Sequence, residues 1–257
     1  MPLEITALGT GHGNVEPGRG QSAFLLRADG ADFLVDAGEP CAASLRALGV
    51  APGALKAVLL THCHADHVGG LPLLLQAAWG DRLGREVPVV APAHALEPLA
   101  AWLNFSLGLL PPQPGFGCQL SAWRNTDEFD FDEISVTPFR TTHLARAGGA
   151  AEAFSLDVRF RGRRICFSGD IGHPDDLGWM DGGSFAFAAC EVSHIEPSAL
   201  VRSFANRRIG TLALTHISAE NLPVAESIRL QFVAACPRID RVVLAADGMN
   251  FLVDEEL

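Results

Sequence analysis

The sequence predicts an α/β protein that folds as one domain over residues 1–257. Short apolar segments bounded by Gly, Asp or Pro interleave with longer amphipathic segments along the whole chain. No linker-like stretch and no repeat divides the chain. Hydrophobic residues make up 48% and charged residues 19%, which is enough apolar material for a sizeable core. Packed layers of sheet and helix are therefore expected.

The expected strands are short and apolar, and the expected helices carry apolar residues at helical spacing. The strands are Glu4–Leu8, Ala23–Arg27, Asp32–Val35, Ala57–Thr61, Val87–Ala91, Ile134–Phe139, Phe154–Phe160, Arg164–Ser168, Phe185–Cys190, Thr211–Thr215 and Arg241–Ala245. The helices are Ala42–Leu48, Leu71–Trp79, Leu96–Leu103, Pro197–Asn206 and Pro223–Ala235. The basic segment Arg159–Arg164 is expected to be a hairpin turn with solvated charges.

The composition disfavours several classes of protein. The formal net charge is −11 and the only basic cluster is the short segment Arg159–Arg164, so a nucleic acid is disfavoured as a partner. The longest strongly apolar stretch, Leu71–Trp79, is far shorter than the about 20 residues that cross a bilayer, so no membrane partner is expected. The N-terminus lacks the features of a signal peptide, and the six cysteines show no CxxC spacing. The expected location is the cytoplasm.

The segment from Thr61 to His67 carries the most informative pattern in the chain. It reads Thr-His-Cys-His-Ala-Asp-His, so three histidines and one aspartate fall within six residues after an apolar strand. Imidazole and carboxylate groups suit zinc, manganese or iron. In an extended loop, residues two apart point the same way, so His62 and His64 can bind one ion. Helix capping by Asp66 is the alternative interpretation, but it explains one residue and leaves the histidines unexplained.

Other polar residues follow the ends of predicted strands. They include His143, Asp170 and His216. Side chains on loops just past strand ends are held by a rigid scaffold and remain accessible. We therefore expect these strand ends to build one active-site edge together with the histidine-rich segment.

Together these motifs resemble the metallo-β-lactamase superfamily, whose hallmark is His-x-His-x-Asp-His after a strand. The turn Asp36–Gly38 is similar to that family's early Asp-x-Gly turn. Asp170 matches the bridging aspartate, and His143 and His216 match the third and last histidines. The resemblance covers nearly the whole chain. It implies a four-layer αββα sandwich with metals at the shared edge of its two sheets.

The resemblance also implies the metal ligands and their chemistry. One ion would be held by His62, His64 and His143, the other by Asp66, His67 and His216, and Asp170 would bridge them. Two divalent ions are implied, with zinc favoured over manganese or iron. Bound ions lower the pKa of coordinated water from about 16 to about 7, and the resulting hydroxide would attack a phosphoryl or carbonyl centre. Asp66 is counted among the catalytic residues as well as among the ligands.

Within the superfamily, the nearest resemblance is to the ribonuclease Z-like and phosphodiesterase branch. Leu8–Gly11 with Pro17–Arg19 is similar to its opening loop, and Ala246–Met249 is similar to its closing strand and turn. Ribonuclease Z inserts a long arm for tRNA between the third histidine and the bridging aspartate, whereas this chain has only residues 144–169 there. Processing of tRNA 3′ ends is therefore disfavoured. The expected substrate is a phosphodiester of a small molecule or nucleotide.

The segment Cys190–Glu196 resembles a compressed form of two ribonuclease Z motifs, His-Glu-Ala-Thr and Ala/Gly-His-Ser-Thr. Within it, His194 is predicted to be the general acid that protonates the leaving group, and Glu191 its orienting carboxylate. An imidazole with a pKa near 6.5 can deliver a proton at neutral pH. The alternative is that His194 caps the helix that begins near Pro197.

Three further features have weaker signals. His12 lies on a loop expected to border the site, and His173 closely follows Asp170, so both are candidates for substrate binding. The apolar segment Phe105–Phe116 is rich in Pro and Gly, so an irregular loop is expected there. Such a loop would form a pocket wall or a homodimer contact rather than plain surface.

Three other functions compete with phosphodiester hydrolysis. The main alternative is hydrolysis of a carboxylic bond in a lactone, thioester or β-lactam, because relatives with the same ligands do this. The absence of tyrosine weakens the lactonase variant. Iron-dependent redox chemistry is disfavoured by the full set of second-metal ligands. A non-catalytic binding module is disfavoured because the ligand positions are intact.

Overall fold

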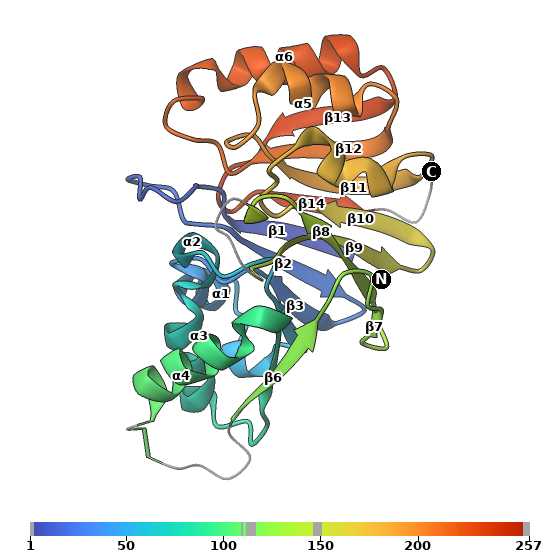
Figure 1. Cartoon of the computed structure of the whole chain (residues 1–257). Helices are drawn as coiled ribbons and strands as arrows, with labels where there is room; N and C mark the ends of the chain where they lie inside the picture. Colours follow the sequence, from blue (N-terminus) through green and yellow to red (C-terminus); the bar gives the residue numbers. More distant parts are fainter. Residues whose placement is uncertain (1–2, 109, 112–116, 146–150, 254–257) are drawn as a thin grey trace.

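The computed structural model describes residues 3–108, 110–111, 117–145 and 151–253, and these residues form four layers (Figure 1). Two seven-stranded sheets lie face to face in the middle, and helices cover the outer face of each sheet. This arrangement confirms the predicted αββα sandwich. No helix in the described ranges is long and apolar enough to cross a membrane.

The first sheet combines the N-terminal part of the chain with the last strand, in the order β14-β1-β2-β3-β4-β5-β6. Its strands are β1 (Leu3–Gly9), β2 (Ala23–Ala28), β3 (Ala31–Val35), β4 (Ala57–Leu59), β5 (Val87–Pro92), β6 (Cys118–Trp123) and β14 (Asn250–Val253). The helices associated with it are α1 (Cys41–Ala47), α2 (Ala65–Val68), α3 (Leu71–Asp81) and α4 (Leu96–Leu107), with 3₁₀ turns η1 (Pro52–Ala54) and η2 (Ala93–Ala95).

The second sheet follows the order β13-β12-β11-β10-β9-β8-β7. Its strands are β7 (Phe129–Asp130), β8 (Ser135–Thr141), β9 (Ala153–Phe160), β10 (Arg163–Phe167), β11 (Ser184–Glu191), β12 (Arg208–Thr215) and β13 (Ile239–Leu244). Its helices are α5 (Pro197–Phe204) and α6 (Ala225–Ala235), with 3₁₀ segments η4 (Pro174–Met180) and η5 (Leu222–Val224). Because β10 to β13 are parallel and β8 to β10 alternate, β8, β10, β11 and β12 all end at the same edge.

Three apolar layers hold the sandwich together. The layer between the sheets contains the fully buried side chains of Phe33, Trp123 and Phe154. A second layer lies under the helices of the first sheet and includes Leu45, and a third lies under α5 and α6 and includes Phe232. Burying one large apolar side chain contributes about 1.5–3 kcal/mol. The three layers therefore fix the two sheets, and the edge where their loops meet, relative to each other.

The elements α2, β6, β7 and β14 are present although they are not among the predicted helices and strands. The strand β6 is an edge strand in which only Trp123 is fully buried, so its sequence lacks strict apolar alternation. One turn of helix (α2) and two residues of strand (β7) are too short to show a period. Whether such short or weakly apolar elements form depends on their contacts with the rest of the fold.

Two local predictions are corrected. The expected irregular loop Phe105–Phe116 is wrong for its first three residues, which extend α4 because the first helix-breaking residue is Gly108. Leu109 and residues 112–116 lie outside the described residues. The expected hairpin is confirmed, since Arg161 and Gly162 have positive φ angles of 48° and 80°. However, Arg164 is not simply solvated, because its guanidinium pairs with the fully buried carboxylate of Asp157 at 3.0 Å.

Candidate metal centre

The metal ligands predicted from the sequence lie together at one edge of the sandwich. They follow β4 and enter α2 in the first sheet, and they follow β8, β10 and β12 in the second. The residues are His62, His64, Asp66, His67, His143, Asp170 and His216. They form two clusters that meet at Asp170.

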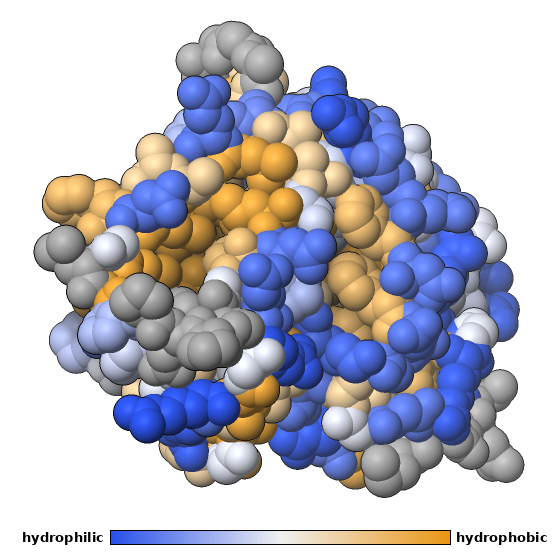
Figure 2. Space-filling view, turned by 90° about the horizontal axis from the view of Figure 1, so that it is seen from below, coloured by the Kyte–Doolittle hydropathy of each residue, from blue (hydrophilic) through white to orange (hydrophobic). Residues whose placement is uncertain are grey.

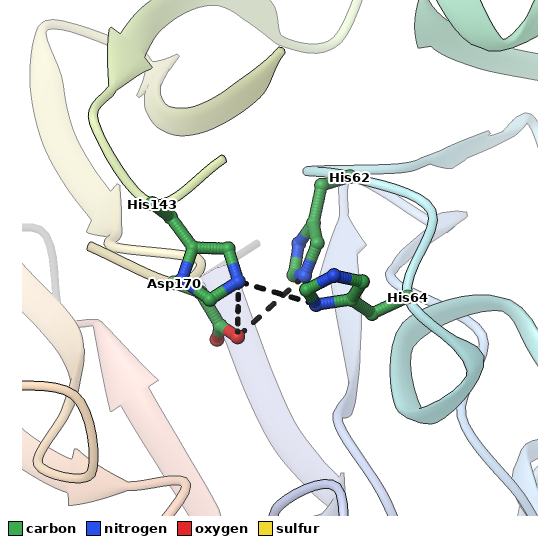
Figure 3. A group of neighbouring side chains, drawn as sticks. All are labelled: His62, His64, His143 and Asp170. Atoms are coloured by element: carbon green, nitrogen blue, oxygen red, sulfur yellow. Dashed lines mark hydrogen bonds and ion pairs between the residues drawn. The ribbon is translucent and has the colours of Figure 1, made fainter. Parts of the chain in front are cut away.

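The first cluster consists of His62, His64, His143 and Asp170 (Figure 3). One ligand atom from each residue lies within 4.8 Å of the others. Asp170 Oδ2 is 3.5 Å from His62 Nε2 and 3.4 Å from His143 Nε2. His143 Nε2 is also 3.2 Å from His64 Nδ1. Three imidazole nitrogens and one carboxylate oxygen thus surround a common space, and this is a donor set that suits tetrahedral zinc.

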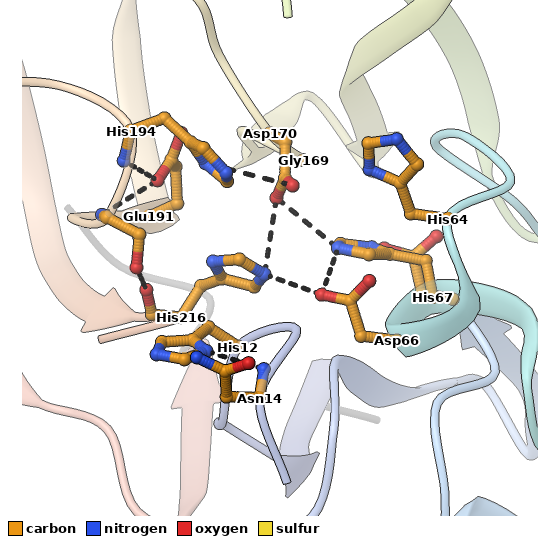
Figure 4. Close-up of polar contacts among 12 residues, drawn as sticks. His12, Asn14, His64, Asp66, His67, Gly169, Asp170, Glu191, His194 and His216 are labelled. Carbon is orange, nitrogen blue, oxygen red and sulfur yellow. Dashed lines mark hydrogen bonds and ion pairs between the residues drawn. The ribbon is translucent and has the colours of Figure 1, made fainter. Parts of the chain in front are cut away.

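The second cluster consists of Asp66, His67 and His216, with Asp170 beside them (Figure 4). His216 Nε2 lies 3.1 Å from Asp66 Oδ2 and 3.5 Å from Asp170 Oδ1. His67 Nε2 lies 3.6 Å from Asp66 Oδ2 and 3.3 Å from Asp170 Oδ1. Asp170 therefore presents Oδ2 to the first cluster and Oδ1 to the second, as a bridging carboxylate would.

The buried atoms of the two clusters fit divalent cations. His62 Nε2, His67 Nε2 and Asp170 Oδ1 are buried and have no hydrogen-bond partner among the described residues. Such atoms are costly unless a ligand compensates their lost hydration. Burial, assisted by the charge of His67, lowers the pKa of His62 well below its usual value, which favours the neutral imidazole that a metal requires. Burial acts to raise the pKa of Asp170, but the charges of the surrounding histidines, led by His67, hold it well below its usual value.

Asp36 contacts the predicted ligand His67 on the side away from the clusters. Its Oδ2 lies 2.7 Å from His67 Nδ1. Its Oδ1 accepts hydrogen bonds from the backbone N–H and the hydroxyl of Thr61, at 2.8 and 3.0 Å. Engagement of Nδ1 by a carboxylate fixes the tautomer of His67, so that Nε2 is the nitrogen available to an ion.

Glu191 and His194 form a hydrogen-bonded pair beside the clusters (Figure 4). Glu191 Oε1 lies 3.0 Å from His194 Nδ1, and Oε2 accepts the backbone N–H groups of Ser193 and His194 at 2.8 and 3.0 Å. Burial acts to lower the pKa of His194, but the hydrogen bond and charge of Glu191, together with Asp170, raise it to about 9. The Glu191 carboxylate therefore favours the protonated form of His194.

An open pocket of about 440 Å³ gives access to both clusters. Its lining is mostly polar and includes His12, Asn14, His64, Asp66, Asp170, Ser193, His194, His216, Ser218 and Glu220. Ligands of both clusters and the proposed general acid thus face one space. We call this space the metal pocket.

Comparison with known proteins now identifies the family. Residues 17–216, which include every predicted ligand, match the metallo-beta-lactamase superfamily. The chain belongs to this superfamily. A superfamily of metal-dependent hydrolases accounts for the two clusters of His and Asp, which are suited to divalent metal ions.

Curated metallo-beta-lactamase relatives confirm the ribonuclease Z-like resemblance. The chain is 38% identical over 179 residues to a protein named Ribonuclease Z from Mycobacterium avium, covering 65% of this chain and 62% of that one. It is 38% identical over 232 residues to another protein of the same name from Mycobacterium marinum, covering 85% and 79%. The chain thus spans about three fifths of the first relative and about four fifths of the second.

Solved metallo-beta-lactamase structures share the fold at lower sequence identity. The fold protein YhfI from Bacillus subtilis superposes with a TM-score of 0.80 at 17% identity, covering 98% of this chain and all of that one. The short form of human tRNase Z gives 0.73 at 21% identity, covering 98% and 99%. A diphosphatase of the PhnP family gives 0.71 at 18% identity, covering 98% and 97%. These likenesses show the fold alone.

The two histidines predicted to bind substrate occupy different places. His12 is buried in the wall of the metal pocket, where its ring nitrogens lie 2.9 Å from the backbone nitrogens of Asn14 and Ala219. His173 instead accepts a hydrogen bond from the backbone N–H of Asp175 and caps η4, and it is not among the described residues that line the metal pocket. A substrate contact stays a prediction for both.

An aspartate that joins two ligand-bearing loops was not predicted. Asp176 Oδ2 accepts hydrogen bonds from the backbone N–H groups of Thr142 and Gly172, at 2.9 and 2.8 Å. It therefore ties the loop that carries His143 to the loop that carries Asp170. The adjacent Asp175-Asp176 pair in the sequence reads as an ordinary helix start, so no local signal distinguishes Asp176.

A second unpredicted aspartate supports the last ligand. Asp247 accepts hydrogen bonds from the backbone N–H and hydroxyl of Thr10, at 2.9 and 2.7 Å. The carbonyl of Thr10 accepts the backbone N–H of His216 at 3.0 Å, and His216 has a positive φ of 50°. Asp247 thus anchors the loop against which a strained ligand backbone rests. The Asp-Gly turn at 247–248 was the available signal, but it identified only a turn.

Proposed function

We propose that this protein is a dinuclear metal-dependent hydrolase that cleaves a phosphodiester of a small molecule or nucleotide. The observation that carries the proposal is the Glu191–His194 pair, which lies beside both ligand clusters with a carboxylate hydrogen-bonded to Nδ1 of the imidazole. The alkoxide that leaves a phosphodiester needs a proton at neutral pH, and a positioned imidazolium can supply it. The curated relatives are named as ribonucleases, which act on the same bond type.

Two residues of the protein act as base and acid in the proposed reaction, Asp66 as the base and His194 as the acid. Burial acts to raise the pKa of Asp66, but the hydrogen bond with His216 and the charge of His67 lower it overall, so Asp66 is ionised. This carboxylate accepts the proton of the attacking water. His194 donates the proton on Nε2 to the leaving oxygen, because Nδ1 is engaged by Glu191. Glu191 is buried behind the ring and orients it.

The metal ions complete the site. When bound, two divalent cations supply positive charge to the phosphoryl oxygens and lower the pKa of a coordinated water. The ligands we assign are His62, His64 and His143 for one ion, Asp66, His67 and His216 for the other, and Asp170 for both. We favour zinc because the donor set is rich in imidazole, with manganese or iron as the alternatives.

The test uses two nucleotide substrates that differ only in the leaving group. One is a dinucleotide, which releases an alkoxide, and the other is a nucleoside 4-nitrophenyl phosphate, which releases a stable phenoxide without protonation. His194→Ala should slow the dinucleotide by about 100-fold or more and slow the nitrophenyl ester far less. Two ions per chain should remain bound. Glu196→Gln is the control, because Glu196 is an exposed carboxylate that caps α5 and contacts neither cluster.

Other outcomes would replace the proposal. Equal losses on both nucleotide substrates would remove His194 as the acid. Loss of one ion in His194→Ala would assign it as a ligand instead, because it also forms a group of potential ligand atoms with Asp170 and His216. Faster turnover of a thioester, lactone or β-lactam than of any phosphodiester would favour the carboxylic alternative. Bound iron in the purified protein, together with consumption of oxygen during turnover, would indicate redox chemistry.

Processing of tRNA 3′ ends is the second candidate, because the curated relatives at 38% identity carry the name Ribonuclease Z. Two features oppose it. The net charge is −11, and the described residues between His143 and Asp170 form chiefly the β9–β10 hairpin rather than an arm. Cleavage of a precursor tRNA with kcat/KM above that of dinucleotides would establish this candidate in place of the small-molecule one.

A further inference from the structure

A second pocket lies beside the metal pocket, and none of the residues assigned to the acid and base steps lines it except through the shared segment 63–66. We call it the apolar pocket. Its volume is about 420 Å³. The main lining residues come from the loop before α2, from α2 and from α4, and are Cys63, Ala65, Val68, Pro98, Leu99 and Trp102. Figure 2 shows a broad, hollowed apolar area on the face seen from below, next to hydrophilic residues.

The apolar pocket and the metal pocket share one wall. Along the segment from 63 to 66, Cys63 and Ala65 line the apolar pocket, whereas His64 and Asp66 line the metal pocket. His64 and Ala65 are both exposed, so the part of the segment between the two spaces reaches the surface as a rim. A ligand of moderate size can therefore lie on the metal ligands and reach over this rim.

A second contact connects the apolar pocket to the first cluster. His94 lines the pocket, and its Nδ1 accepts the backbone N–H of Glu152 at 3.2 Å. Glu152 immediately precedes β9, on the connection that starts at His143. This hydrogen bond thus ties one lining residue of the pocket to the residue that precedes β9.

The pocket is uncharged, in contrast to the metal pocket. None of its described lining residues is Asp, Glu, Lys or Arg. Cys63 contributes a half-buried free thiol to the lining. Burial lowers the pKa of His94, so its ring is neutral at pH 7. Trp102 lines the pocket and leaves 37% of its surface exposed, so it offers a large apolar ring to a ligand.

We propose that the apolar pocket binds an aromatic or similarly apolar ester group of the substrate while the phosphodiester lies in the metal pocket. This inference rests on the proposed function and specifies the substrate class as a phosphodiester with one neutral apolar substituent. A cavity of about 150 Å³ can hold a benzene ring, so the pocket has room for one or two rings. The shared wall indicates that the occupant is part of the substrate rather than a separate protein surface.

The first test compares two inhibitors of the zinc-loaded protein, methyl phosphate and phenyl phosphate, which share the phosphoryl group. Phenyl phosphate should bind at least about 10-fold more tightly, because only it reaches the apolar pocket. Trp102→Ala should raise the Ki of phenyl phosphate by about 10-fold and leave the Ki of methyl phosphate unchanged. Trp102→Phe should restore most of the preference. Trp79→Ala is the matched control, because Trp79 lies on α3 outside the pocket lining.

The second test does not depend on turnover. The chain has four tryptophans, so protein labelled with 5-fluorotryptophan gives a ¹⁹F signal for Trp102 that the Trp102→Phe variant identifies. Phenyl phosphate and 2-naphthol should both shift this signal, and methyl phosphate should not. If phosphodiesters are cleaved but neither aromatic probe moves the Trp102 signal and the inhibitor preference is absent, the apolar pocket is not a substrate site.

The remaining outcomes separate this inference from the proposed function. If 2-naphthol shifts the Trp102 signal while no phosphodiester is cleaved, the pocket stands as an aromatic site and the assigned bond type is wrong. If Trp102→Glu converts a dimer to a monomer and the inhibitor preference does not change in Trp102→Ala, the face contacts a second copy of the chain. That result would overturn the substrate assignment.

Discussion

Replacing Glu191 by glutamine removes the charge that keeps the proton on His194 and preserves the size of the side chain. Glu191 Oε1 lies 3.0 Å from His194 Nδ1. Burial acts to lower the pKa of His194, but the carboxylates of Glu191 and Asp170 raise it to about 9. One opposite charge at such a distance shifts a pKa by about 1–3 units. The carboxylate of Asp170, whose Oδ2 lies 3.8 Å from His194 Nδ1, is unchanged by this substitution. We therefore expect the pKa of His194 in Glu191→Gln to be lower by about 1–2 units.

The substitution should lower kcat mainly at high pH, because only the protonated form of His194 can act as the general acid. A general acid works below its pKa, so the rate is present at low pH and is lost as the pH rises through that pKa. With a pKa of about 9, nearly all His194 is protonated at about pH 8. With a pKa of about 7, roughly one tenth is protonated there. Across a drop of about 1–2 units, turnover of a dinucleotide should therefore fall by about 2- to 10-fold at pH 8 and by less than about twofold at pH 6.

The assay is the pH profile of kcat for the dinucleotide, with metal content measured on the same samples. Bound cations lower the pKa of His194 in both proteins alike and move the pH at which the fall appears, so the displacement between the two alkaline limbs is the diagnostic quantity. Glu196→Gln, which removes an exposed carboxylate nearby, should leave the limb in place. An alkaline limb that does not move in Glu191→Gln with two ions bound would show that this carboxylate does not control the acid.

Three further predictions concern the metal ligands and their supports. Asp36→Asn should weaken the ion held with His67 by about 10–100-fold in a chelator competition, because it removes the carboxylate 2.7 Å behind that ring; equal affinity would contradict this. Removing one ion present at about 1,000 times its Kd should cost about 4 kcal/mol. That loss should lower Tm by roughly 10 °C in a thermal melt with chelator. Asp247→Ala should free Thr10 and weaken the ion held with His216 more than the ion of the first cluster, as measured by calorimetric titration; equal weakening would mean a general loss of stability.

The sequence determined the fold class and the identity of the residues that meet at the site. Metal binding needs imidazole and carboxylate side chains in a dense group, so the spacing from His62 to His67 indicated a site without knowledge of the fold. Apolar strands ending directly before His143, Asp170 and His216 indicated that these residues share one edge. Weakly apolar or very short elements such as β6 and β7 were not predictable, because their sequences carry no period.

Only the tertiary structure decided how these residues are used. Asp170 presents one oxygen to each cluster because the two sheets pack at a fixed offset over a common apolar layer. Asp247 and Thr10 meet across 237 positions, and Asp176 and Thr142 across 34. The apolar pocket likewise forms only where residues of the histidine loop, α2 and α4 come together. Distances between residues so far apart in sequence are set by packing of the whole core, which no local pattern of residues specifies.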